Sequence, residues 1–123
     1  MQREEWFHRA VIYQVDSSLF YDANGDGFGD LAGIRQKLHY IRSLGATVLW
    51  LTPFYLTPLQ DDGYDISDHL QPDPRFGTIA DVIELIARAR ELGLRVIVEL
   101  VIQHPSAQHP WFQAARRDPR SPW

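Results

Sequence analysis

The strongest constraint on the fold is a unit that occurs twice: an amphipathic helix, a glycine and a short buried strand. The segment LGATVLWL at residues 44–51 parallels LGLRVIVE at residues 92–99. Upstream of each glycine, apolar residues recur every three or four positions, which is the spacing of one helical face. Each glycine stands where helices commonly end. The repeat predicts helices that alternate with strands of a parallel sheet covered on both faces.

The limits of these elements follow from local signals. The apolar run Ala10–Val15 predicts a first buried strand, and later strands are expected at 48–51 and 96–101. One helix is expected from Leu31 to Leu44. A second follows Thr78, with Asp81 in a capping-box position.

A long polar loop is expected at residues 52–77, and no helix is expected after the third strand. The fold class is α/β with about three strands and two helices. It is either a small open sheet or the N-terminal part of a (β/α)8 TIM barrel. In the second case residues 1–123 form a partial catalytic barrel that ends where the loop after strand three begins.

Composition narrows the class of protein. Hydrophobic residues make up 45% of the 123 residues, enough for a core, and the net charge of -4 gives no basic footprint for nucleic acid. There is no cysteine, which excludes disulfides and thiolate metal sites. The charged start MQREEWFHRA lacks the apolar stretch of a signal peptide, and no apolar run could span a membrane. We expect a cytoplasmic protein with no membrane or nucleic-acid partner.

An acidic loop after the first strand has the pattern of a metal site. The segment DANGDGFGD at residues 22–30 alternates carboxylate and amide side chains with small residues. Calcium binds about six to eight oxygens of this kind. The candidate ligands are Asp22, Asn24, Asp26, the carbonyl of Phe28, and Asp30. The first positions match an EF-hand, but Gly33 stands at its twelfth position and a strand precedes the loop. The alternative is a turn without metal.

Further candidates lie where the second and third strands end, the edge that carries chemistry in parallel sheets. Tyr64 can stack on a sugar ring and Asp65 can accept its hydroxyl protons; the alternative is a turn carboxylate beside a half-buried tyrosine. Glu99 is either a site residue or half of a core ion pair. His104, next to Gln103, can donate to a substrate hydroxyl or be an ordinary loop histidine. Three nearby carboxylates, Asp61, Asp62 and Asp68, are expected to be solvated, and His109–Phe112 is expected to form a packed turn.

Seven segments together resemble the alpha-amylase family of glycoside hydrolases (family 13), in order along nearly the whole chain. They are AVIYQV at 10–15, DANGDGFGDL at 22–31, LG through WLTP at 44–53, GYDI at 63–66, FGT at 76–78, VELVIQH at 98–104 and QHPWF at 108–112. The calcium loop and the His-Pro-Trp-Phe turn are most similar to the trehalose synthase and oligo-1,6-glucosidase branch. The chain corresponds to an N-terminal fragment of such a protein.

The resemblance implies a (β/α)8 barrel that acts on α-glucosides or small oligosaccharides with retention, through two carboxylates. In the family these carboxylates come from later strands, so no catalytic residue is expected here. Tyr64 would be the stacking platform, Asp65 would bind the hydroxyls of the sugar, and His104 would bind its hydroxymethyl group. Glu99 and Gln103 stand near the site where the family usually has Asp and Asn.

The resemblance thus predicts the N-terminal portion of an α-glucoside hydrolase or a glucosyltransferase or isomerase, inactive alone. One alternative is a non-catalytic calcium- or sugar-binding module of the same fold. Another is a stand-alone α/β domain with no sugar role.

Overall fold

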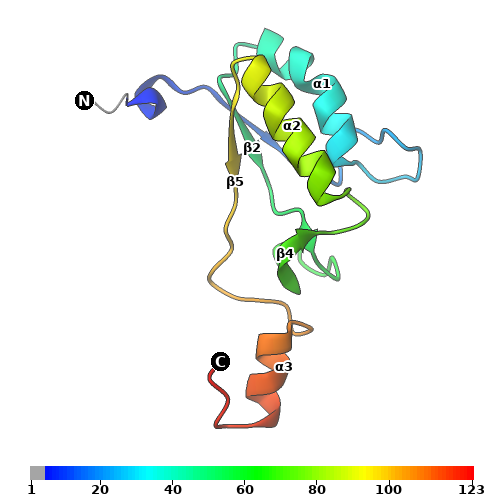
Figure 1. The fold of residues 1–123 in the computed structure, drawn as a ribbon, viewed down its shortest axis with the longest axis vertical. Coiled ribbons are helices and arrows are strands. Elements are labelled where there is room, and N and C mark those ends of the chain that lie inside the picture. The colour runs from blue at the N-terminus through cyan, green and yellow to red at the C-terminus, as the bar shows by residue number, and fades with distance from the viewer. Residues whose placement is uncertain (1–4) are drawn as a thin grey trace.

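The computed structural model describes residues 5–123 and shows a three-stranded parallel sheet covered on one face by two helices (Figure 1). The sheet has the order β1-β2-β5 and is made of β1 (Ile12–Val15), β2 (Val48–Leu51) and β5 (Arg95–Val98). The helices α1 (Leu31–Ser43) and α2 (Ile79–Glu91) lie side by side. This arrangement confirms the alternation of helices and parallel strands that the repeated unit predicts.

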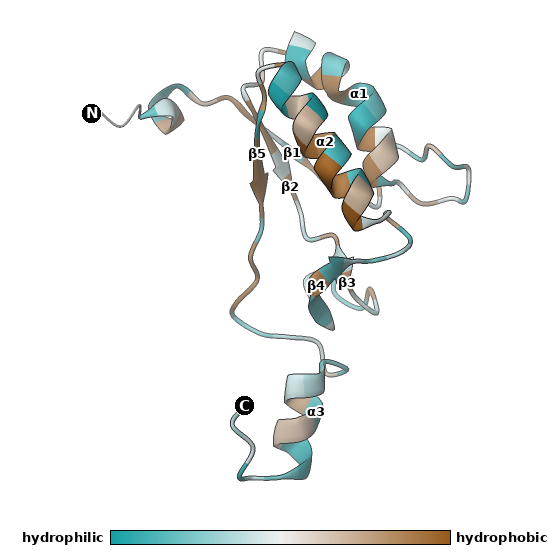
Figure 2. Cartoon of the chain, viewed as in Figure 1, coloured by the Kyte–Doolittle hydropathy of each residue, from teal (hydrophilic) through white to brown (hydrophobic). Residues whose placement is uncertain are grey.

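The sheet register places the core between the sheet and the helices. Tyr13, Leu49 and Val96 lie abreast on adjacent strands, and so do Val15, Leu51 and Val98. All six pack with the apolar faces of α1 and α2. Side chains alternate along a strand, so Gln14, Trp50 and Ile97 project from the opposite face. Figure 2 shows that the first half of α2 is mostly hydrophobic, and the residues of this helix that are buried are Leu85 and Ala89.

The helix ends agree with their sequence signals. Asp30 is the N-cap of α1, and its side chain accepts the N–H of Gly33. Thr78 and Asp81 form a complete capping box at the start of α2. Gly45 and Gly93 follow the two helices with φ angles of 89° and 73°, the left-handed conformation that glycine adopts without a Cβ clash.

Three further elements lie outside the predicted pattern. They are the 3₁₀-helix η1 (Trp6–Arg9), the antiparallel hairpin of β3 (Tyr55–Leu56) and β4 (Asp68–Pro72), and helix α3 (Pro110–Arg117). The expectation of one long loop at 52–77 was wrong, because this hairpin is too short and polar to show an alternating pattern. The expectation that no helix follows the third strand was also wrong, and His109–Phe112 begins α3 rather than forming a turn.

The outer strands are shorter than expected. The first begins at Ile12 rather than Ala10, and the third runs from Arg95 to Val98 rather than from 96 to 101. Leu51 pairs with Val98 as the last residue of β2. Pro53 follows and has no N–H to donate, so the ladder stops there and Glu99 lies just past the strand instead of inside it.

Residues 99–109 form an extended connection that carries α3 to the opposite end of the molecule from α1 and α2 (Figure 1). Within residues 5–123, no helix is both long enough and apolar enough to cross a membrane.

Candidate functional site

The candidate site gathers where the three parallel strands end, and Glu99 is at its centre. The Oε1 atom of Glu99 accepts two hydrogen bonds, from Trp50 Nε1 at 2.8 Å and from the Tyr64 hydroxyl at 3.0 Å. The Tyr55 hydroxyl donates to the main-chain oxygen of Glu99 at 2.9 Å. Glu99 therefore links β2, the loop after it and the end of β5.

The structure does not place Glu99 in a core ion pair. None of the ion pairs formed within residues 5–123 includes Glu99. Its partners are instead the neutral donors Trp50 and Tyr64. A glutamate reaches one methylene further than the aspartate usual in the family, and this longer side chain reaches both donors.

The Tyr64 hydroxyl lies in a strongly negative environment. Burial, followed by the hydrogen bond to Glu99 and the negative charges of Glu99, Asp16 and Asp61, raises the pKa of Tyr64 to about 12. The phenol is thus a hydrogen-bond donor at any physiological pH. Asp16, which follows β1, brings a carboxylate from the third of the three strand ends.

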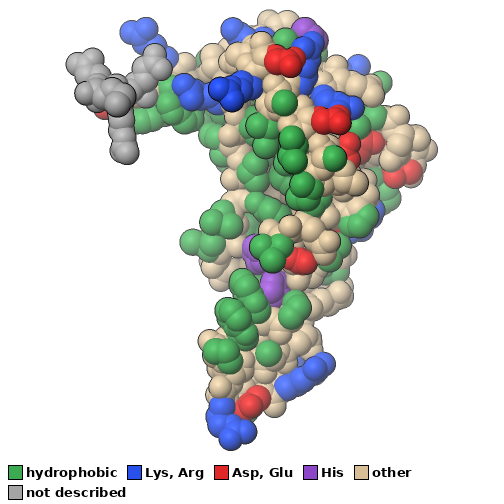
Figure 3. Space-filling view, in the orientation of Figure 1, with side chains coloured by type: hydrophobic (Ala, Val, Ile, Leu, Met, Phe, Trp, Pro, Cys, Tyr) green, Lys and Arg blue, Asp and Glu red, His purple; other side chains and the backbone are tan. Residues whose placement is uncertain are grey.

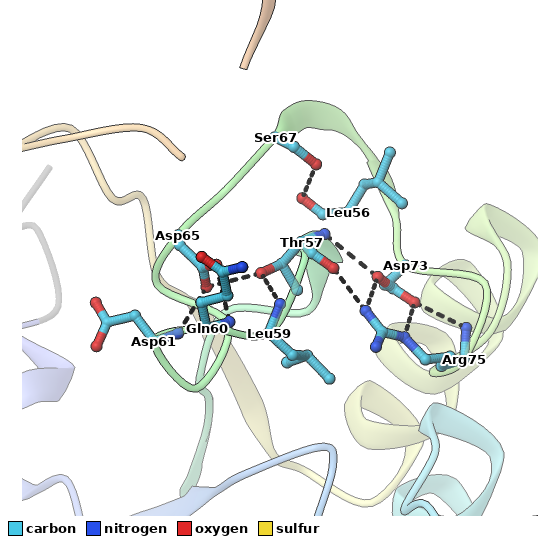
Figure 4. A network of polar contacts seen from close by, with 9 residues as sticks. All are labelled: Leu56, Thr57, Leu59, Gln60, Asp61, Asp65, Ser67, Asp73 and Arg75. Carbon is cyan, nitrogen blue, oxygen red and sulfur yellow. Dashed lines mark hydrogen bonds and ion pairs between the residues drawn. The ribbon is translucent and has the colours of Figure 1, made fainter. Parts of the chain in front are cut away.

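Asp65 holds the loop in which Tyr64 lies (Figure 4). Its Oδ1 accepts the Thr57 hydroxyl at 2.8 Å and the N–H of Asp61 at 3.1 Å, and its Oδ2 accepts the N–H of Gln60 at 2.9 Å. Burial of Asp65 opposes its charge, but these hydrogen bonds outweigh the burial and keep the pKa of Asp65 below its usual value. The carboxylate is buried and is saturated by its own loop.

Asp61, unlike Asp65, is exposed to solvent and lies beside His104. Asp61 Oδ2 is 3.7 Å from His104 Nε2, and both side chains are about half exposed or more. The N–H of Tyr64 donates to the Asp61 carbonyl at 2.8 Å, which closes a tight turn and brings Asp61 next to Tyr64. The Asp-Asp-Gly sequence before Tyr64 is a turn signal that sequence reasoning could have used.

His104 and Gln103 are exposed and line a hollow of about 340 Å³ on the segment after β5. Its other lining residues are mostly apolar: His69, Leu100, Val101, Ile102, Pro105 and Trp111. The structure thus joins Tyr64 to Glu99 and His104 to Asp61, with Gln103 next to His104 in the same hollow. Asp65 is buried.

A histidine pair ties the hairpin to the segment after β5. His69 Nδ1 lies 3.4 Å from His109 Nε2, and His69 Nε2 lies 3.2 Å from the Val101 carbonyl. His109 Nδ1 accepts the N–H of Trp111, so His109 is the N-cap of α3. Burial, together with the nearby His69, lowers the pKa of His109, and Asp68 opposes this effect. No sequence signal indicated this pair.

The acidic loop is built from turns that its side chains close. Asp22 accepts the N–H groups of Gly25 and Gly27, at 2.7 and 2.8 Å, and the bond from Gly27 is the main reason that the pKa of Asp22 is lowered. Asn24 and Asp26 each accept the N–H two residues later. Asp30 is buried. Its Oδ2 accepts the N–H of Ala23 at 3.0 Å, and its Oδ1 accepts the N–H of Gly33 in α1.

The donor atoms of this loop fit calcium chemically, because all are oxygens of carboxylate, amide or carbonyl groups. Among residues 5–123, however, no three acidic or histidine side chains gather closely enough to hold a metal ion. The three candidate carboxylates, Asp22, Asp26 and Asp30, are thus close in the chain without meeting at one point.

Polar side chains at the carboxyl ends of parallel strands, with helices between the strands, are the arrangement found at the active end of (β/α)8 barrel enzymes. Residues 14–123 match the family described as the alpha amylase catalytic domain. The chain belongs to the alpha-amylase family and has the fold of part of its (β/α)8 barrel, as the resemblance predicted.

Curated relatives agree with this membership. The chain is 49% identical over 118 residues to the trehalose synthase/amylase of Mycolicibacterium smegmatis, 51% over 117 residues to the trehalose synthase of Thermus thermophilus, and 45% over 119 residues to the oligo-1,6-glucosidase of a Bacillus species. These matches cover 95–97% of this chain but only 20%, 12% and 23% of the relatives, respectively. The chain therefore spans less than a quarter of the relatives' length.

Solved structures show the same fold. A mutant of MutB in complex with the substrate sucrose matches with a TM-score of 0.92 at 42% identity, covering 96% of this chain and 21% of that one. The trehalose-6-phosphate hydrolase of Bacillus licheniformis, as a mutant complex, matches with a TM-score of 0.92 at 43% identity, covering 95% and 21%.

Proposed function

We propose that this chain supplies the sugar-binding edge of an α-glucoside hydrolase or of a related glucosyltransferase or isomerase. The observation that carries the proposal is the pair of contacts Tyr64–Glu99 and Asp61–His104, which the turn between Asp61 and Tyr64 joins at the strand ends. A phenol that stays protonated and an exposed carboxylate suit the donors and acceptors of a neutral, hydroxyl-rich ligand. The names of two relatives, trehalose synthase and oligo-1,6-glucosidase, support the proposal that this ligand is an α-glucoside.

The residues divide the recognition of the sugar between them. Tyr64 is the surface on which the ring stacks, and His104 binds a hydroxyl group of the sugar. Asp61 makes the contact with hydroxyls that the resemblance implies for Asp65, because Asp61 is exposed and both oxygens of Asp65 already accept hydrogen bonds from the loop. Asp65 serves the same function indirectly, by holding the loop. Reaction with retention needs two further carboxylates, so the 123-residue chain alone binds sugar without hydrolysing it.

A titration of the full chain with maltose, followed by amide NMR, tests this function. We expect shifts at Tyr64 and His104, and we expect them to be lost in Asp61→Asn. The matched control is Asp62→Asn, which removes the same charge from the neighbouring exposed position and should titrate like the wild type. No response in the wild type, or an unchanged response in Asp61→Asn, would contradict the proposal. Turnover of p-nitrophenyl α-glucoside by the purified chain would contradict its inactivity.

We also propose that calcium binds the acidic loop in a structural role. The ligands would be Asp22, Asn24, Asp26, the Phe28 carbonyl and Asp30, and the ion would join the start of α1 to the loop before it. Isothermal calorimetry with CaCl₂ should show binding that Asp22→Asn weakens at least tenfold and that Asp62→Asn leaves unchanged. Calcium should also raise the melting temperature, since it binds only the folded chain. Absence of both effects would refute the site, and calcium binding without any response to sugar would favour a non-catalytic module.

A further inference from the structure

The ion pair between Asp73 and Arg75 lies away from the sugar-binding edge and binds the first residue of the loop 57–65 (Figure 4). Asp73 is 3% exposed, and Arg75 donates to it from Nε at 2.7 Å and from Nη2 at 2.6 Å. Such a two-point contact fixes direction as well as distance, because the guanidinium plane matches the carboxylate. The pair is therefore a rigid anchor next to the loop.

Both members of the pair also hold the main chain of Thr57. The N–H of Thr57 donates to Asp73 Oδ2 at 3.2 Å, and its carbonyl accepts from Arg75 Nη2 at 2.6 Å. The hydroxyl of Thr57 then donates to Asp65 and accepts the N–H of Leu59 at 3.0 Å. Thr57 is buried, and its N–H, its carbonyl and its hydroxyl all form hydrogen bonds. Through these bonds Thr57 joins the ion pair to Leu59 and Asp65 of the loop.

The loop needs such an anchor because its backbone is unusual. Leu59 and Asp62 have φ angles of 54° and 49°, in the left-handed region that residues other than glycine seldom adopt. Gly63 has φ 91°, and a Cβ there would lie 3.0 Å from the carbonyl of Pro53. Conformations of this kind persist only where their surroundings determine them.

We propose that Arg75, Asp73 and Thr57 form a positioning clamp that holds the loop 57–65 so that Asp61 and Tyr64 face Glu99 and His104. None of the three clamp residues reaches the sugar-binding edge itself. The clamp acts through Asp65, which receives the Thr57 hydroxyl on one side and the N–H groups of Gln60 and Asp61 on the other. Its importance for sugar binding rests on the function proposed above, whereas its effect on the loop does not.

The ionisation of Tyr64 at pH 11 reports the position of the loop without any ligand. A phenol of pKa about 12 is roughly 10% ionised at pH 11, whereas one near the ordinary value of about 10 is roughly 90% ionised. The full chain carrying ¹³Cζ-tyrosine gives one NMR signal per tyrosine, and Tyr64→Phe assigns the signal of interest. Circular dichroism at the same pH checks that each variant is folded.

Two variants should release the loop and two should not. Thr57→Val keeps the shape but loses the hydroxyl, and Arg75→Gln breaks the two-point contact; both should turn Tyr64 from mostly protonated to mostly ionised at pH 11. Thr57→Ser restores the hydroxyl and should behave as the wild type. Arg35→Gln is the matched control, since Arg35 also pairs with a carboxylate, that of Glu84, and is about as exposed as Arg75, at 34% against 38%.

The clamp is refuted if Tyr64 stays protonated in folded Thr57→Val, or if Thr57→Ser fails to restore the wild-type signal. A wild-type Tyr64 already ionised at pH 11 would refute the loop position itself. If Arg75→Gln does not fold, the comparison of Thr57→Val with Thr57→Ser still tests the clamp. Maltose titration of the same variants separates the two proposals. If the variants change the ionisation of Tyr64 but the wild type does not bind maltose, only the proposed function is refuted. If the wild type binds maltose but the variants leave Tyr64 unchanged, only the clamp is refuted.

Discussion

At the scale of single residues, two aspartates of one loop have different roles because of where their oxygens point. Asp65 is buried and accepts three hydrogen bonds, whereas Asp61 is exposed beside His104. In Asp65→Asn, an amide NH₂ would replace one carboxylate oxygen and could not accept the hydrogen bonds that this oxygen receives. Each buried donor left without an acceptor lowers the free energy of unfolding by about 1–3 kcal/mol. Urea unfolding should show this loss of stability. Asp62→Asn should stay within about 0.5 kcal/mol of the wild type, and equal effects in the two variants would contradict the assignment.

Gly33 gives a second prediction at this scale. It lies inside α1, where alanine is intrinsically the better helix former by about 1 kcal/mol. A Cβ at Gly33 would nevertheless lie 2.0 Å from the carbonyl oxygen of Tyr21. We therefore expect Gly33→Ala to destabilise the fold by about 1–3 kcal/mol, as overpacking does. The exposed Gln36→Ala on the same helix is the control, and a stabilised Gly33→Ala would refute the contact.

Residue types predicted that the candidate residues lie at the strand ends, but not the direction of each side chain. Tyr64, Glu99 and His104 were singled out because they follow strands, and parallel strands end at one edge. Whether Asp61 or Asp65 faced outward depended on Thr57 and on the turn between Asp61 and Tyr64, which are contacts that no spacing rule gives.

At the scale of elements, the histidine pair joins β4, α3 and the segment after β5, and it should make stability depend on pH. Both ring nitrogens of His109 already have partners, so a proton added to His109 must break a hydrogen bond. The pKa of His109 is lowered in the fold by burial and by His69, with Asp68 opposing. The unfolded chain therefore binds more protons than the folded one as the pH falls below about 6.5, and stability is lost as the pH falls through the folded pKa of His109.

Urea unfolding at pH 7.5 and at pH 5.5 measures this dependence. His109→Asn keeps a capping side chain but removes the titrating ring, and it should reduce the loss of stability between the two pH values. His8→Asn alters an exposed histidine far from the pair and should leave the loss unchanged. A wild-type stability that does not change across this window would contradict the prediction.

The elements differed in how well the sequence predicted them. The helices α1 and α2 have long apolar periodicity and favourable N-caps, so their limits were predictable nearly to the residue. Helix α3 has proline at its first position, a real helix signal, but its N-cap is a histidine, which is not among the favoured capping residues. The hairpin of β3 and β4 is held by its side-chain network rather than by an apolar pattern.

At the scale of the whole molecule, the sheet has two open edges. Within the described residues 5–123, the strands β1 and β5 each pair on one side only, and apolar side chains near them are exposed, among them Ile12, Leu100 and Ile102. Figure 3 shows hydrophobic side chains along the same face down to α3. Open edges beside apolar surface favour association between chains.

We therefore expect the 123-residue chain to self-associate as its concentration rises. Light scattering after size exclusion should show the mean mass increasing with concentration, and Ile102→Lys should reduce this increase. Leu19→Lys changes a side chain that is equally exposed, at 81% against 84%, but lies in a different loop. A strictly monomeric chain at all concentrations would contradict this prediction.

The clamp at Thr57 and Asp65 closes its loop at the base and leaves the tip, Asp61 and Asp62, exposed to solvent. Under the proposed function, stability and sugar recognition thus depend on separate positions. New side chains can be tried at the tip, by evolution or in a designed library, with little risk to the barrel. The base, in contrast, should tolerate almost no exchange. Within one family, such a division would let sugar preference diverge quickly on a scaffold that changes slowly.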